Sequence, residues 1–125
     1  MINLLYCFDS NYNLMAFSSI VSILDKIDEK INIYIIHDKI NISQDIPSYI
    51  NNHINLNEIY TYKFENKDNL FPNVETSHVS EATYYRLFIE DYLGNNPDYL
   101  VYLDADVVCL KNPLNYLKRK ISSME

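Results

Sequence analysis

The chain has 125 residues, of which 48% are apolar, and this size and composition fit one globular domain and exclude a disordered segment. Its net charge of −7, from 10 basic and 17 acidic residues, argues against nucleic acid or an anionic membrane surface as a partner, because both require a basic surface. The single glycine, Gly94, excludes the glycine-rich phosphate loops GxGxxG and GxxxxGK[ST]. Any bound phosphate must therefore be held by something other than a glycine-rich loop.

The location of the protein is predicted from its hydropathy and its cysteines. No apolar run approaches the length of about 20 residues that a membrane-spanning helix needs. The amino terminus lacks the basic segment of a signal peptide. The two cysteines, Cys7 and Cys109, lie far apart without CxxC spacing, which favours two buried thiols in a reducing compartment. These features predict a cytoplasmic protein.

Hydrophobic periodicity predicts alternating strands and helices along the chain. Residues 2–8 and 31–37 are nearly continuous apolar runs, which are typical of buried strands. Between them, residues 12–27 repeat apolar side chains at helical spacing. The remaining expected elements are a weaker helix over 43–53, a strand over 56–64, a polar loop over 65–77, a helix over 80–93 and a strand over 99–103.

This order of elements predicts the fold class. Strands that alternate with helices indicate an α/β, Rossmann-like fold, with a mostly parallel sheet and helices on both faces. In such sheets ligands bind beyond the carboxyl ends of the strands. The chemistry is therefore expected at residues 9–11, 37–38 and 104–106, which follow the first, second and fourth strands.

Two carboxylates, Asp104 and Asp106, directly follow the apolar residues 99–103. If the strand stays extended, both side chains point the same way and repel each other unless a cation lies between them. A divalent metal that prefers oxygen ligands, Mg²⁺ or Mn²⁺, would remove this repulsion and bridge the acidic protein to a diphosphate. The alternative is that this Asp-x-Asp stretch is only a turn at the end of a strand.

Other polar residues are candidates with two interpretations each. Arg86 lies on a mostly apolar helix and needs an anionic partner, which is either a ligand or a nearby acidic side chain. Asp9 and Asn11 either bind a ligand or close the turn after the first strand. His78 precedes the helix over 80–93 and is more typical of an ordinary loop histidine.

Three stretches resemble glycosyltransferase family 8, the retaining nucleotide-sugar transferases that include bacterial lipopolysaccharide galactosyl- and glucosyltransferases and glycogenin. They are CFDSNY at 7–12, HVSEATYYRLFIEDYL at 78–93 and DYLVYLDADVVCLKNPLNYL at 98–117. Their order and spacing fit the N-terminal half of the family's GT-A fold, and the resemblance runs over essentially the whole chain.

The resemblance implies a metal-dependent transfer of glucose or galactose from UDP-glucose or UDP-galactose to a glycan or lipopolysaccharide-type acceptor, with retention. Asp104 and Asp106 would hold Mn²⁺ (or Mg²⁺) against the diphosphate, and the backbone of Ala105 would lie near the ribose. Cys7, Asp9, Asn11 and Tyr12 would hold uracil and ribose, His78 and Val79 would border the nucleotide, and Arg86 would reach toward the sugar-phosphate.

The family's catalytic domain is longer than this chain. The resemblance implies that a histidine completing the metal site, the residues that grip the sugar, and the acceptor surface all follow the DxD motif outside this chain. We therefore expect residues 1–125 to form the nucleotide-sugar-binding part of a GT-A domain, with an incomplete metal site and catalytic residues elsewhere.

Two other functions stay open. The chain could be a UDP-sugar-binding module or truncated transferase without turnover. LVYLDADVV also fits the hhhhDxDx[TV] motif of haloacid-dehalogenase-type phosphatases, although that motif normally opens its fold and here follows several strands. Separately, the apolar residues 107–110 have no obvious intramolecular partner, which predicts a homo-oligomer formed through this sheet edge.

Overall fold

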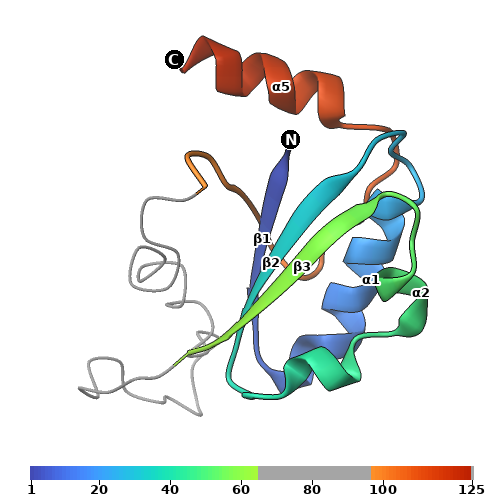
Figure 1. Cartoon of the computed structure of the whole chain (residues 1–125), viewed down its shortest axis with the longest axis vertical. Helices are drawn as coiled ribbons and strands as arrows, with labels where there is room; N and C mark the ends of the chain where they lie inside the picture. Colours follow the sequence, from blue (N-terminus) through green and yellow to red (C-terminus); the bar gives the residue numbers. More distant parts are fainter. Residues whose placement is uncertain (65–96, 125) are drawn as a thin grey trace.

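The computed structural model describes residues 1–64 and 97–124 of the chain (Figure 1). These residues contain a four-stranded sheet with the strand order β3-β2-β1-β4, and its pairings are parallel. The strands are β1 (Asn3–Phe8), β2 (Ile31–His37), β3 (Leu56–Lys63) and β4 (Val101–Leu103). The predicted α/β class with a parallel sheet is therefore confirmed.

Helices cover one face of this sheet in the described part of the chain. In Figure 1, α1 and α2 lie against that face, and α5 lies beyond the amino ends of the strands. Among the residues that the structure describes, no helix is both long and apolar enough to cross a membrane. The helical elements are the 3-10 helix η1 (Ser10–Tyr12), α1 (Asn13–Leu24), the 3-10 helix η2 (Ile42–Asp45), α2 (Ser48–Asn51) and α5 (Leu114–Ser123).

The core occupies both faces of β1 and β2. Leu4, Tyr6 and Phe8 of β1 are buried in one cluster with apolar residues of α1. The alternate residues Leu5 and Cys7 are buried on the opposite face. Both faces are thus apolar, which explains why these strands are continuous apolar runs in the sequence. The expected loop over 65–77 and helix over 80–93 lie outside the described residues.

An asparagine ladder crosses three strands near their amino ends. The Asn57 amide donates a hydrogen bond to Asn32 Oδ1 at 2.8 Å, and the Asn32 amide donates to Asn3 Oδ1 at 2.9 Å. A shift of one residue between neighbouring strands would point these side chains to opposite faces and break both bonds. The ladder therefore helps to hold the strands in register, which keeps their carboxyl ends aligned at the other edge.

The prediction of one continuous helix over 43–53 was wrong. The segment is divided into η2 and α2, because Pro47 has no backbone N–H and the residue before a proline avoids helical dihedrals. Ile46 accordingly has an extended backbone, with φ −69° and ψ 125°. Pro47 then stands at the start of α2, the position where proline is tolerated.

The segment after β4 does have partners within the chain, contrary to the expectation for residues 107–110. The Cys109 N–H donates to Ser22 Oγ of α1 at 2.9 Å. The helix α5, which the sequence analysis did not predict, packs Leu114 into the core and pairs Lys118 with Glu29. Val108 and Leu110 remain exposed, so the homo-oligomer stays a prediction.

Replacing Leu114 by alanine tests whether α5 belongs to the folded core. This side chain is only 2% exposed, so Leu114→Ala should lower the free energy of unfolding by about 2–4 kcal/mol. Leu110, which is 80% exposed, provides the matched control, and Leu110→Ala should change that free energy by less than about 0.5 kcal/mol. Urea unfolding measures both, and equal effects would show that α5 is not part of the core.

Candidate functional site

The candidate site lies where the chain leaves β1 and β4. These strands are adjacent and parallel, with Leu4 opposite Val101 and Tyr6 opposite Leu103. Both strands therefore end at the same edge of the sheet, where ligands of parallel α/β folds bind. The two segments that follow, residues 9–12 and 104–107, carry most of the described candidate residues.

The turn after β1 is closed by Asp9. Its Oδ1 accepts a hydrogen bond from the Asn11 N–H at 2.9 Å, and its carbonyl accepts one from the Tyr12 N–H at 3.0 Å. Asp9 thus fills the turn-closing role considered in the sequence analysis, which leaves its second carboxylate oxygen for a ligand. The Asn11 and Tyr12 side chains are exposed.

The turn after β4 places both carboxylates in solvent. β4 ends at Leu103, and the Val107 N–H donates to the Asp104 carbonyl at 3.2 Å, which closes a turn. Because residues 104–107 form a turn and not an extended strand, strand alternation does not set the directions of the Asp104 and Asp106 side chains. Both side chains are exposed, while Ala105 is half-buried against the core.

One hollow of about 490 Å³ joins the two turns. It brings Asn11 together with Ala105 and Asp106, residues that are far apart in the sequence. Among the described residues that line it, none is basic. The lining consists of Asn11, Leu14, Met15, Ser18, Ala105, Asp106, Val107 and Val108.

Four other described candidates do not line this hollow: Cys7, Asp9, Tyr12 and Asp104. The Cys7 side chain is buried on the opposite face of the sheet from α1, with Leu5 and Ile36. Strand alternation made this face predictable, because Cys7 lies between Tyr6 and Phe8, which are buried with α1. Cys7 and Cys109 form no disulfide. His78, Val79 and Arg86 lie outside the described residues.

His37 at the end of β2 is fully buried; the sequence placed it at the expected binding edge, within residues 37–38, but assigned its side chain no specific role. Its Nε2 lies 2.8 Å from Asn13 Oδ1, and its Nδ1 accepts a hydrogen bond from the Lys39 N–H at 3.0 Å. Burial lowers the pKa of His37 below its usual range, although Asp38, Asp9 and Asp45 oppose this shift. The one signal in the sequence was a histidine that ends an otherwise apolar strand.

The oxygen donors at this edge fit a hard divalent cation. Mg²⁺ in particular is bound by one or two carboxylates together with waters and substrate phosphates, and Asp104 and Asp106 offer two exposed carboxylates. Within residues 1–64 and 97–124, no group of three or more His, Cys, Asp or Glu side chains could hold a metal. The described residues can therefore supply part of a coordination shell.

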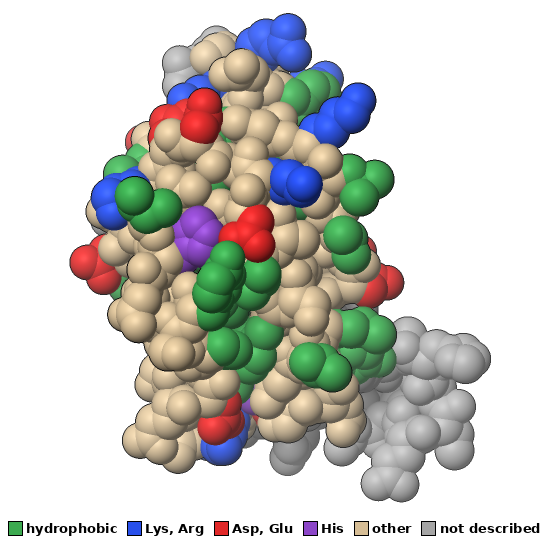
Figure 2. Space-filling model, turned by 90° about the vertical axis from the view of Figure 1, so that its right-hand side faces the viewer, with side chains coloured by type: hydrophobic (Ala, Val, Ile, Leu, Met, Phe, Trp, Pro, Cys, Tyr) green, Lys and Arg blue, Asp and Glu red, His purple; other side chains and the backbone are tan. Residues whose placement is uncertain are grey.

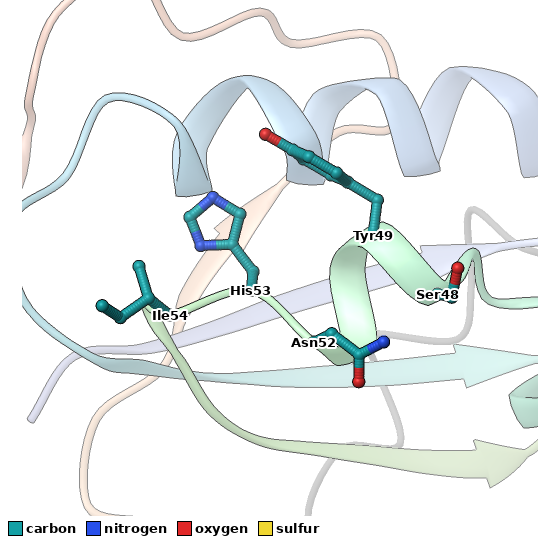
Figure 3. A pocket seen from close by; sticks show the side chains of 5 residues that line it. All are labelled: Ser48, Tyr49, Asn52, His53 and Ile54. Carbon is teal, nitrogen blue, oxygen red and sulfur yellow. The ribbon is translucent and has the colours of Figure 1, made fainter.

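A second hollow, of about 420 Å³, lies beside α2 (Figure 3). Tyr49 and His53 extend from this region toward α1, and both hydrogen-bond to Asp25 Oδ1, at 2.6 and 3.0 Å. The bond from Tyr49, and then that from His53, lowers the pKa of Asp25. Because Asp25 follows the carboxyl end of α1, this hollow lies far from the turn that precedes α1. We interpret these hydrogen bonds as structural contacts that hold the region of α2 against the carboxyl end of α1.

The parallel sheet with polar turns at its carboxyl edge defines a Rossmann-like class of α/β fold. The sequence profile of glycosyl transferase family 8 matches residues 3–122, and the chain belongs to that family. No curated protein sequence matches the chain significantly.

Two solved structures share its fold. A crystal structure of an active-site mutant of LgtC has a TM-score of 0.74 and 21% identity, over 92% of this chain and 41% of that chain. The apo structure of WbbM, a bifunctional glycosyltransferase, has a TM-score of 0.66 and 22% identity, over 94% of this chain and 20% of that chain. These matches confirm the expected GT-A fold. The chain spans less than half the length of either protein.

The buried imidazole predicts a pH dependence of stability. With its pKa lowered in the folded state, His37 takes up a proton more readily in the unfolded chain, so stability should fall as the pH drops below about 6.5. His37→Gln removes the titrating group and should reduce this slope. Urea unfolding at about pH 7.5 and about pH 5.5 measures it. Identical slopes in the variant and the parent chain would contradict the assignment.

Proposed function

We propose that residues 1–125 are the nucleotide-sugar-binding part of a metal-dependent glycosyltransferase. The donor would be a UDP-hexose, UDP-glucose or UDP-galactose, and the sugar would pass with retention to a glycan or lipopolysaccharide-type acceptor. One observation carries the proposal: in a chain of glycosyl transferase family 8, the turns after β1 and β4 line one hollow at the carboxyl edge. The two thiols, without a disulfide, favour a cytoplasmic location.

A divalent cation suits this hollow, because without one the negative charge of the hollow would repel a diphosphate. The protein has a net charge of −7, and Asp106 is the charged side chain among the described lining residues. An anionic ligand would be repelled unless a cation neutralised the carboxylates. Asp104 and Asp106 would hold Mn²⁺ or Mg²⁺, which when bound supplies positive charge to the diphosphate and stabilises the UDP leaving group.

The other lining residues suit a nucleoside. The exposed Asn11 amide offers both donors and an acceptor for a ribose or uracil, as does the backbone at Ala105. Leu14, Met15 and Val108 provide apolar surface on which a planar base can pack. Asp9 would act mainly through the turn it closes, and Tyr12 stands exposed beside it.

The remaining predicted contacts rest on the family pattern. Cys7 is proposed to support the nucleotide site indirectly, as a buried residue of the strand that precedes the turn. His78 and Val79 are proposed to border the nucleotide, and Arg86 to reach the sugar-phosphate.

A binding module without turnover is the second candidate. It is favoured by the described residues, among which no group of three or more His, Cys, Asp or Glu side chains could hold a metal. Release of hexose from UDP-glucose or UDP-galactose distinguishes the two, because a transferase commonly hydrolyses its donor slowly when no acceptor is present. A haloacid-dehalogenase-type phosphatase does not fit membership of glycosyl transferase family 8.

Calorimetry of UDP binding tests the proposed metal dependence. UDP should bind with Mn²⁺ present and lose at least about tenfold in affinity with a chelator, because no described lining residue supplies positive charge. Asp104→Ala and Asp106→Ala should each cause a similar loss. Asp98→Ala removes an exposed acidic residue on the same segment and should leave affinity unchanged. Equal UDP affinity with Mn²⁺ and with chelator would refute the proposal.

A further inference from the structure

The buried His37 lies directly behind the turn that follows β1. In the sheet it stands opposite Phe8, the last residue of β1, and its ring meets that of Phe8 edge-on, with centroids 5.0 Å apart. The imidazole therefore occupies a fixed position between the end of β2 and the beginning of α1. The proposed function assigns it no contact with the nucleotide.

The hydrogen bonds of His37 locate its proton. Nδ1 accepts from the Lys39 N–H at 3.0 Å, so in the neutral ring the proton is on Nε2, which donates to Asn13 Oδ1 at 2.8 Å. The charged groups that act on the ring are Asp38, whose Oδ1 lies 3.0 Å from Nδ1, and then Asp9, Asp45 and Lys39. Burial outweighs the three carboxylates and lowers the pKa of the ring, which favours its neutral form.

Asn13 connects this imidazole to the turn. It is the first residue of α1, and its backbone N–H donates to the Ser10 carbonyl. At the other end of the turn, Asp9 accepts hydrogen bonds from the backbone N–H groups of Asn11 and Tyr12. The turn is thus held by Asp9 at its start and, through Asn13, by His37 at its end.

We propose that His37 is a positioning residue, whose Nε2–H···Asn13 bond holds the turn over residues 9–12 in the conformation that presents Asn11 to the nucleotide. This inference rests on the proposed function, because it assigns a purpose to the turn. If the first turn of α1 moved, Asn11, Leu14 and Met15 would move with it, and these three residues form one wall of the hollow.

Two amide substitutions separate the contacts of the two ring nitrogens. Asparagine places its amide near the position of Nδ1 and can keep the Lys39 contact, whereas glutamine reaches the position of Nε2 and can keep the Asn13 contact. In calorimetry with UDP and Mn²⁺, His37→Gln should bind like the parent chain. His37→Asn should bind about five- to tenfold more weakly, the size expected from one hydrogen bond.

The partner residue provides the second arm of the experiment. Asn13→Ala removes the acceptor, leaves the buried ring in place and should weaken binding as much as His37→Asn does. The double variant should show no further loss, because both changes remove the same interaction. Ser19→Ala is the matched control on the same helix as Asn13. It deletes the buried 2.8 Å hydrogen bond between Ser19 of α1 and Tyr6 of β1, and should lower stability without changing UDP affinity.

Amide hydrogen exchange gives a measurement that needs no ligand. The Asn11 and Tyr12 N–H groups should exchange faster in His37→Asn and Asn13→Ala, and at the parental rate in His37→Gln and Ser19→Ala. Parental affinity and exchange in Asn13→Ala would overturn the inference, as would equal losses in all four variants. If the parent chain fails to bind UDP, the proposed function fails, whereas the exchange rates still decide whether His37 holds the turn.

Discussion

β1 pairs with parallel strands on both of its sides, and the rest of the described molecule depends on this position. Its alternate residues are buried on both faces, so that Leu4 and Tyr6 meet α1 while Leu5 and Cys7 enter the second core. A strand that is buried on both faces carries its polar residues at or beyond its ends. Asp9 directly follows the carboxyl end of β1, and Asp104 and Asp106 follow β4 at the same edge of the sheet.

Charge sets the chemistry at this edge. Figure 2 shows basic side chains gathered at one end of the molecule, the end at which α5 lies in Figure 1. The basic residues of α5 are Lys118, Arg119 and Lys120, whereas the hollow at the carboxyl edge of the sheet contains Asp106 and no basic residue among its described lining. An acidic protein without a glycine-rich loop can accept a diphosphate there if a divalent cation mediates the contact.

Much of this arrangement could be predicted from local patterns. Continuous apolar runs predicted β1 and β2, helical spacing predicted α1, and the position of polar residues after the strands predicted the binding edge. The helix α5 was missed, although Leu114, Leu117 and Ile121 recur at helical spacing and Pro113 stands directly before its first residue. The break at Pro47 was also predictable from its missing N–H.

Long-range contacts limited the remaining predictions. The strand end at residue 103 was predicted correctly, but the exposure of Asp104 and Asp106 depends on a turn that closes at Val107, which the sequence pattern did not specify. The role of His37 depends on Asn13, which lies 24 residues earlier in the chain. No local pattern could show that these two residues meet, because parallel pairing of β1 with β2 brings them together.

The central claim is that the turns after β1 and β4 hold one metal–nucleotide complex. Paramagnetic broadening of backbone amide signals by Mn²⁺, recorded in the presence of UDP, tests this claim most directly. We expect broadening centred on residues 9–12 and 104–107, while the signals of Asn32 and Asn57 at the opposite edge stay sharp. Broadening centred on Asp25 and His53, or spread evenly over the chain, would contradict the account.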